Sequence, residues 1–231
     1  MNIVIGSLLE GARRANGRVA VIDVFRAFTS AAVALANGAA RIVMVGSADE
    51  ALAQRQSGLG QVCMGEVGGL MPPGFDYGNS PFAIAGVDFR GMTIIQRTSA
   101  GTQGIVAAAP RADRLYAASL ATATATARAL SADGAKTFTL VAMGNEGADR
   151  ADEDELCALH LRNILQGRPG DPAAVQGVIL ASREATRFGS PAYPQHHPGD
   201  CDIALAIDRH DFAIRVTMED GRPVARIERG A

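Results

Sequence analysis

Short apolar runs alternate with amphipathic, alanine-rich segments along most of the chain. Runs rich in β-branched residues and bounded by turn residues predict strands, and apolar residues at helical spacing predict helices. The runs that predict strands are 19–24, 41–45, 61–64, 92–96, 115–118, 137–143, 212–217 and 223–227. The segments that predict helices are 28–37, 47–56, an apolar stretch after residue 102 reaching 109, 119–130, 152–166 and 199–207.

This repeated alternation of strand and helix predicts an α/β fold with helices on the faces of a sheet. The continuous apolar character of the strands is typical of a mainly parallel sheet that is covered on both faces. After Gly167 the pattern loosens, and the turn at 219–221 predicts a hairpin between the last two strands. No linker divides the chain, so we expect residues 1–231 to form a single domain.

The composition of the chain argues against several kinds of binding partner and structural framework. The 231 residues are 48% hydrophobic and 20% charged with a net charge of -2, which suits a sizeable core and argues against nucleic-acid binding. No apolar stretch is long enough to span a bilayer, and Arg13 and Arg14 follow the first apolar run, whereas a signal peptide has its basic residues before it. Three widely spaced cysteines support neither a disulfide framework nor a zinc motif. We expect a cytoplasmic protein with a small-molecule ligand.

The loop at 65–81 is rich in glycine and proline, which excludes a helix or a central strand. It also carries Glu66, Asp76, Asn79 and Ser80. Glycines that permit close backbone approach, next to groups that bind cations or anions, indicate a functional loop.

Asp23 and Arg26 follow the first predicted strand, at the sheet edge where open α/β folds bind ligands. One interpretation is a carboxylate that binds metal or attacks, beside a guanidinium that holds an anion. The other is a helix N-terminal charge with a surface ion pair. Asp23 lies within an apolar run, where an unused charge is costly, and this favours the functional interpretation.

Two further segments lie at such strand ends. Thr98, Ser99, Gly101 and Thr102 open a helix, and they fit a phosphate cradle and simple helix capping equally well. Ser119 repeats the arrangement, where capping is the commoner role. The carboxylates that cluster at the start of another helix are Asp149, Asp152, Glu153, Asp154 and Glu155. They complement the helix dipole, but their number also fits a divalent cation.

Other motifs are absent or weak. The four histidines lack metal-motif spacing, and His196 and His197 are expected at the surface. Cys157 is expected to be buried and inert. The P-loop lysine, Gly-x-Gly-x-x-Gly and Gly-x-Ser-x-Gly patterns do not occur, which argues against common kinases, dehydrogenases and esterases.

Six separated motifs, in one order, resemble the 2-phosphosulfolactate phosphatase family. They are VIDVFRA at 21–27, GE and GG at 65–66 and 68–69, GFDYGNSP at 74–81, Thr98 with Gly101 and Thr102, Ser119 with Leu120, and Glu153 and Asp154 with Cys157 and Ala158. The resemblance implies a three-layer α/β/α sandwich with a mainly parallel or mixed central sheet. It also implies a Mg²⁺-dependent phosphatase of the coenzyme M pathway that converts 2-phospho-3-sulfolactate to 3-sulfolactate.

The chain departs from the family pattern at three positions. Val67 stands where the family has arginine, and Ala100 and Thr122 stand where it has asparagine. The missing arginine would help to hold a substrate that carries a phosphate, a carboxylate and a sulfonate, and Arg97 is a candidate replacement. Two alternatives therefore stay open: a phosphatase for another 2-phospho acid, and a non-catalytic binder of a phosphorylated metabolite.

The resemblance assigns provisional roles. Metal ligands are drawn from Asp23, Glu66, Asp76, Glu153 and Asp154. Substrate-binding residues are drawn from Asn79, Ser80, Arg97, Thr98, Ser99, Gly101, Thr102 and Ser119. Arg26 would hold phosphoryl oxygens, and either a metal-activated water or the Asp23 carboxylate would attack phosphorus. A homodimer is expected only because dimers are common.

Overall fold

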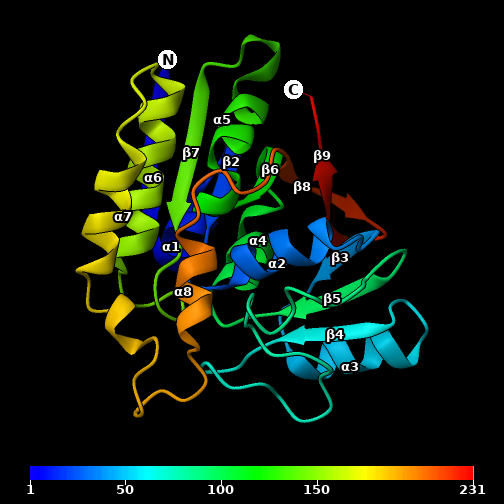
Figure 1. The fold of residues 1–231 in the computed structure, drawn as a ribbon. Coiled ribbons are helices and arrows are strands. Elements are labelled where there is room, and N and C mark those ends of the chain that lie inside the picture. Colours follow the sequence, from blue (N-terminus) through cyan, green and yellow to red (C-terminus); the bar gives the residue numbers. More distant parts are fainter. Residues whose placement is uncertain (231) are drawn as a thin grey trace.

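The fold is shown in Figure 1, in a computed structural model that describes residues 1–230. The strands are β1 (Asn2–Ser7), β2 (Gly17–Ile22), β3 (Arg41–Met44), β4 (Val62–Gly65), β5 (Thr93–Arg97), β6 (Ala112–Ala118), β7 (Thr137–Ala142), β8 (Ala213–Glu219) and β9 (Arg222–Glu228). The α-helices are α1 (Leu8–Arg14), α2 (Ala27–Ala36), α3 (Ala48–Gln56), α4 (Gly101–Ala108), α5 (Ala123–Ser131), α6 (Asp152–Leu165), α7 (Pro172–Leu180) and α8 (Pro198–Ala204). Short 3₁₀ turns are η1 (Leu120–Thr122), η2 (Ala132–Gly134) and η3 (Ala185–Arg187).

All strands of the described chain belong to one mixed sheet, in the order β1-β7-β2-β6-β8-β9-β3-β5-β4. Strands β1, β7, β2 and β6 pair in parallel, and so do β3, β5 and β4. The hairpin β8–β9 lies between these two parallel groups and pairs antiparallel with β6 and with β3. The prediction of an α/β fold with a mainly parallel or mixed sheet is confirmed.

Helices cover both faces of this sheet, as the side chains of β2 illustrate. Val19 and Val21 pack into a core that includes residues of α1, α2 and α4, whereas Ala20 and Ile22 pack into a second core with residues of α5 and α6. Because successive side chains of a strand point to opposite faces, a strand that is apolar at every position needs cover on both sides. The three-layer α/β/α arrangement follows.

The sheet is bent so that the ends of its two parallel groups converge. In Figure 1 the arrowheads of β7 on one side and of β4 and β5 on the other point toward the same central region, beside α2 and α8. The loops that follow the strands of both groups therefore meet, although the strands are far apart in the sheet order. This convergence places the candidate site.

The predicted hairpin is confirmed. Strands β8 and β9 pair along their whole length, and the two turn residues Asp220 and Gly221 have φ values of 48° and 76°. Two successive residues with positive φ match the tight turn that twisted hairpins prefer, and glycine adopts such angles without steric cost.

Among the strands and α-helices of the described residues, three have no counterpart in the prediction: β1, α1 and α7. Strand β1 lies at the edge of the sheet and pairs only with β7, and it shows no fully buried position. Helix α7 begins with Asp171, whose side chain accepts a hydrogen bond from the Ala173 N–H, followed by Pro172 at the first helical position. This pair is a recognised helix-start signal, so α7 was predictable from the sequence.

Within residues 1–230, no helix has both the length and the apolar character needed to cross a bilayer. Cys63, Cys157 and Cys201 are buried free thiols in the structure, so the predicted burial of Cys157 is confirmed.

Candidate active site

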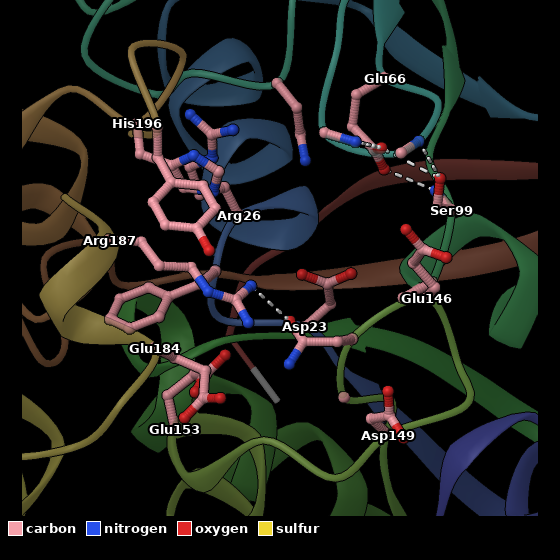
Figure 2. Close-up of a pocket in the computed structure, with 18 of the residues that line it drawn as sticks. Asp23, Arg26, Glu66, Ser99, Glu146, Asp149, Glu153, Glu184, Arg187 and His196 are labelled. Atoms are coloured by element: carbon pink, nitrogen blue, oxygen red, sulfur yellow. Dashed lines mark hydrogen bonds between the residues drawn. The ribbon is translucent and has the colours of Figure 1, made fainter. Parts of the chain in front are cut away.

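A cavity of about 720 Å³ opens where the strand ends converge (Figure 2). Its walls come from the segments that follow β2, β4, β5 and β7, from the first turn of α6 and from the chain between α7 and α8. Ligand sites of open α/β sheets lie outside the carboxyl ends of parallel strands, and this cavity has that position. Candidate site residues from several strand ends and from the acidic start of α6 thus line one cavity.

Asp23 lies at the centre of this cavity and is only 5% exposed. Its carboxylate accepts a hydrogen bond from the Ala27 N–H at 2.9 Å and is also hydrogen-bonded by the backbone of Gly101. A Cβ atom on residue 101 would lie 2.8 Å from the Asp23 Oδ2 atom, so only glycine lets α4 approach this closely. Burial, and to a smaller degree the charge of Glu66, raise the pKa of Asp23 to about 6 despite these hydrogen bonds.

Glu153 is buried in the first turn of α6 and lines the same cavity. Its Oε2 atom has no hydrogen-bond partner within residues 1–230. Burial, followed by the negative charges of Glu184 and Asp23, raises the pKa of Glu153 to about 8. Figure 2 shows Asp23 between Glu66 with Ser99 at one end and Glu153 with Glu184 at the other. A cation would relieve the repulsion among these carboxylates and supply the missing partner.

Asp154, the next residue along α6, points elsewhere and does not line the cavity. Its Oδ1 accepts from the Val24 N–H at 2.7 Å and its Oδ2 from the Gly144 N–H at 2.8 Å. Burial, together with the charges of Glu153 and Asp23, raises its pKa well above the ordinary value. Both oxygens are thus used to hold the loops after β2 and β7, which makes Asp154 a positioning residue in this structure.

Glu66 is held by the loop that follows β5. Its Oε1 accepts from the Ser99 N–H at 2.5 Å, and its Oε2 accepts from the Gly69 N–H at 2.7 Å and from the Ser99 hydroxyl at 3.0 Å. All three residues line the cavity. Asn79 also lines it, and its buried Oδ1 atom has no partner within the described residues. This wall therefore combines a fixed carboxylate with an amide oxygen that is free to bind.

The hydroxyls of Thr98 and Thr102 are used within the fold. The Thr98 N–H donates to Thr102 Oγ1 at 2.8 Å, and the Thr102 N–H donates to Thr98 Oγ1 at 3.0 Å. This reciprocal capping leaves Ser99 and Ala100 as the residues of the turn that line the cavity. Ser119 is fully buried outside the lining, and its Oγ has no partner within residues 1–230. The Thr98 hydroxyl thus satisfies an N–H in the first turn of α4, whereas Ala100, at the N-cap position, offers no side-chain cap.

Arg26 is buried in the cavity wall, after a cis peptide bond to Phe25. Its Nη1 group donates to Asp200 Oδ2 at 2.7 Å and to the Gln195 carbonyl at 2.8 Å. The other Asp200 oxygen, Oδ1, accepts from the Ser80 hydroxyl at 2.5 Å and from the Phe82 N–H. Ser80 therefore supports Arg26 through Asp200 and does not line the cavity.

The structure does not bring Asp76 to the cavity. Its Oδ2 accepts from Arg55 Nη1 at 2.7 Å and from the Cys63 N–H at 2.8 Å, and the residue is exposed. These contacts fix the loop after β4 against α3, so Asp76 is not placed to bind a metal ion in the cavity, contrary to the prediction.

The three residues that differ from the pattern of the family also have clear positions in the structure. Val67 is 46% exposed and lies outside the lining, as does Thr122, whereas Ala100 lines the cavity. The Arg97 guanidinium donates to the Glu66 carbonyl at 2.7 Å and to the Ser99 hydroxyl at 3.2 Å. Because Arg97 is outside the lining as well, it is used to shape the loop, and the structure gives no support to the idea that it replaces the missing cavity charge.

Sequence reasoning missed most of the wall between α7 and α8. The lining residues there are Arg183, Glu184, Arg187, Phe188, Tyr193, Gln195 and His196. Contrary to the surface position expected for it, His196 is half-buried, and burial followed by the charges of Arg26 and Arg187 lowers its pKa to about 4. The segment has no hydrophobic periodicity, so only the helix-start signal of α7 could have shown that it folds back over the sheet edge.

Replacing Glu153 by Gln should stabilise the metal-free protein at alkaline pH. Folding raises the pKa of Glu153 from 4.5 to about 8, because burial favours the protonated carboxyl group. The contribution of this group to the stability of the fold is therefore complete below pH 4.5 and is lost as the pH rises to about 8. Thermal unfolding in the presence of a chelator measures this effect. The free energy of unfolding of Glu153→Gln should equal that of the parent protein near pH 4.5 and exceed it by about 2–4 kcal/mol above pH 8.

The exposed Asp152, in the same helical turn, provides the matched control for this measurement. Asp152→Asn removes a carboxylate from the same helix start without removing a buried one, so its stability should follow that of the parent protein at every pH. Parallel pH profiles for Glu153→Gln and the parent protein would contradict the assigned burial of charge.

The fold and the cavity together define a class: an α/β protein with an acidic, oxygen-lined ligand site at the ends of its parallel strands. Comparison with known proteins identifies the protein family to which the chain belongs. The family model described as 2-phosphosulpholactate phosphatase matches residues 5–188, which is more than half of the chain. The chain belongs to the 2-phosphosulfolactate phosphatase family.

Individual relatives agree with this placement. A protein of Bacillus subtilis named "Probable 2-phosphosulfolactate phosphatase" is 36% identical over 90% of both chains. Proteins of the same name from Deinococcus radiodurans and Thermus thermophilus are 36% and 38% identical, over 58% and 60% of this chain. Those two alignments span little more than half of the relatives, 55% and 56% of their length.

Proposed function

We propose that this protein is a Mg²⁺-dependent phosphatase that hydrolyses 2-phospho-3-sulfolactate to 3-sulfolactate and phosphate. The observation that carries the proposal is the group of buried carboxylates in one cavity of a chain of this family. Asp23 and Glu153 face each other's charge there, and Glu153 Oε2 is buried without a partner in the described chain. Such an arrangement is costly to the fold unless a positively charged group binds it.

The donors fit magnesium. Among residues 1–230, no three histidine, cysteine or acidic side chains form a ready-made metal cage. Mg²⁺ does not require one, because it is commonly held by one or two carboxylates, several waters and the phosphate of its substrate. Asp23 and Glu153 would be these ligands, and Glu66, whose two oxygens already accept three hydrogen bonds, would add negative charge near Asp23. Bound there, the ion would neutralise phosphate charge and polarise the phosphoryl group.

Residues of the chain supply the rest of the phosphate site. The phosphoryl group would lie beside Asp23, next to Ser99 and Ala100 before the start of α4, where the partial positive charge of a helix N-terminus favours an anion. Arg26 lines the same space, and within residues 1–230 its Nε and Nη2 groups make no hydrogen bond. These donors can bind phosphoryl oxygens as negative charge develops on them in the transition state.

Attack on phosphorus is by water or by the Asp23 carboxylate. The stereochemistry at phosphorus distinguishes the two routes, because a single displacement inverts the configuration and two successive displacements retain it.

Phosphate release tests the proposal directly. Purified protein with Mg²⁺ should release phosphate from 2-phospho-3-sulfolactate, EDTA should abolish the release, and added Mg²⁺ should restore it. Release that persists in EDTA would contradict the metal dependence. Release only from other 2-phospho acids would assign a different substrate, and binding without release from any ester would identify a non-catalytic binder.

A further inference from the structure

The cavity contains several positive charges, and they are not equally available. The arginines that line it are Arg26, Arg150, Arg183 and Arg187. Arg26 is ion-paired with Asp200, and Arg150 is largely exposed and lies 3.5 Å from Glu155. Within residues 1–230, neither Arg183 nor Arg187 forms an ion pair. Arg183 is exposed and Arg187 is half-buried, so Arg187 is the deeper of these two charges.

Arg187 is fixed at the end of η3 by contacts from two sides. Its Nη1 group donates to Asn145 Oδ1 at 3.2 Å, on the loop after β7, and its guanidinium carbon lies 5.7 Å from the centre of the Tyr193 ring. Figure 2 shows the side chain pointing into the cavity toward Asp23. A single neutral hydrogen bond leaves most of the guanidinium donors free, and these donors match a planar or tetrahedral oxyanion.

The half-buried histidine on the wall that carries Arg187 adds no positive charge there. His196, on the same wall, has its pKa lowered to about 4 and is therefore neutral at physiological pH. Glu153 and Glu184 face the guanidinium from α6 and from the segment before η3, and neither forms an ion pair with it. The charge of Arg187 nevertheless reaches both Glu153 and His196, since it lowers the pKa of each.

We propose that Arg187 binds the non-reacting anionic end of the substrate and selects phosphate esters that carry a carboxylate or a sulfonate over esters with a neutral tail. This inference rests on the proposed function. It also explains how the cavity can bind such a substrate although Val67, where the family has arginine, lies outside the lining. The charge would come from the segment between α7 and α8, and not from the loop after β4.

Substrate comparison with Arg187→Gln tests this role. The variant should lower kcat/KM for 2-phospho-3-sulfolactate about 10- to 100-fold, mainly through KM, because a hydrogen-bonded ionic contact is lost. The loss for phenyl phosphate, whose tail is neutral, should stay below about 3-fold, and 2-phospholactate tells whether the carboxylate or the sulfonate is bound. Arg187→Lys should recover part of the loss, and Arg168→Gln, at an exposed position outside the cavity, should show none. An equal loss on phenyl phosphate, or no loss on the sulfonated ester, would overturn the assignment.

Calorimetric titration with 3-sulfolactate keeps this test independent of turnover. The parent protein should bind 3-sulfolactate, and Arg187→Gln should bind it at least about 10-fold more weakly. Equal affinities, or no binding to the parent protein, would overturn the inference even if phosphate were released. Absence of phosphate release from every ester, with Arg187-dependent binding retained, would instead refute only the proposed reaction.

Discussion

Replacing Asp23 by Asn should lower kcat for phosphate release by about 10³-fold or more. Asp23 is the buried carboxylate at the centre of the cavity, and in the proposed reaction it either binds the metal or attacks phosphorus. An amide has neither the charge nor the nucleophilicity for these roles. Steady-state phosphate release with saturating Mg²⁺ is the measurement, and a variant with a near-normal rate would exclude Asp23 from the chemistry.

The fold of this variant should be intact, which separates lost chemistry from lost structure. The amide oxygen can still accept the hydrogen bond from the Ala27 N–H. Because folding raises the pKa of Asp23 from 3.8 to about 6, the carboxylate's favourable contribution is complete below pH 3.8 and is lost as the pH rises to about 6. Asp23→Asn should therefore raise Tm at neutral pH in the absence of metal.

Asp76→Asn is the matched comparison for this experiment. Asp76, like Asp23, is a carboxylate in one of the motifs that resemble the family. Its contacts are with Arg55 and Cys63, however, and lie outside the cavity. Its removal should change kcat less than about 3-fold while lowering stability by about 1–2 kcal/mol through the lost loop contacts. A large loss of activity would restore Asp76 as a ligand.

The layers of the fold were predictable because they depend on local pattern. Strands such as β2 and β3 contain continuous buried apolar runs, at 19–22 and 42–44, and helices such as α3 carry both a capping serine and acidic residues in the first turn. The order of strands was not predictable in this way. The insertion of the hairpin β8–β9 between β6 and β3 depends on pairings between residues more than 90 positions apart, such as Leu115 with Val216.

Part of the candidate site was predictable, because polar residues at the end of a strand or at the start of a helix are placed at the sheet edge where ligands bind. Asp23, Glu66 and Glu153 follow that rule and meet in the cavity. Sequence could not separate Glu153 from Asp154, because the two differ only in the 100° rotation between neighbouring helix positions. It could not find Arg187 either, since that side chain reaches the cavity through long-range packing of a segment without periodicity.

Replacing Arg26 by Met should lower kcat/KM for phosphate release by about 10²- to 10³-fold. Among the arginines that line the cavity, Arg26 carries the most deeply buried guanidinium, so solvent cannot replace its charge. The same change leaves Asp200 buried without its cation, so it should also cost about 3–5 kcal/mol of stability. The single variant therefore cannot tell whether Arg26 acts in catalysis or only in folding.

The double variant Arg26→Met with Asp200→Asn separates the two roles. Asn can keep the hydrogen bonds that Asp200 Oδ1 accepts from Ser80 and Phe82, and no buried charge remains. Replacing both members of a buried ion pair is often nearly neutral, so stability should return to within about 1–2 kcal/mol of the parent protein. Catalysis should remain lost, because the donors for the phosphoryl oxygens are still missing. If activity returned together with stability, Arg26 would be a structural residue and the phosphate would be held by the metal and the α4 N-terminus alone.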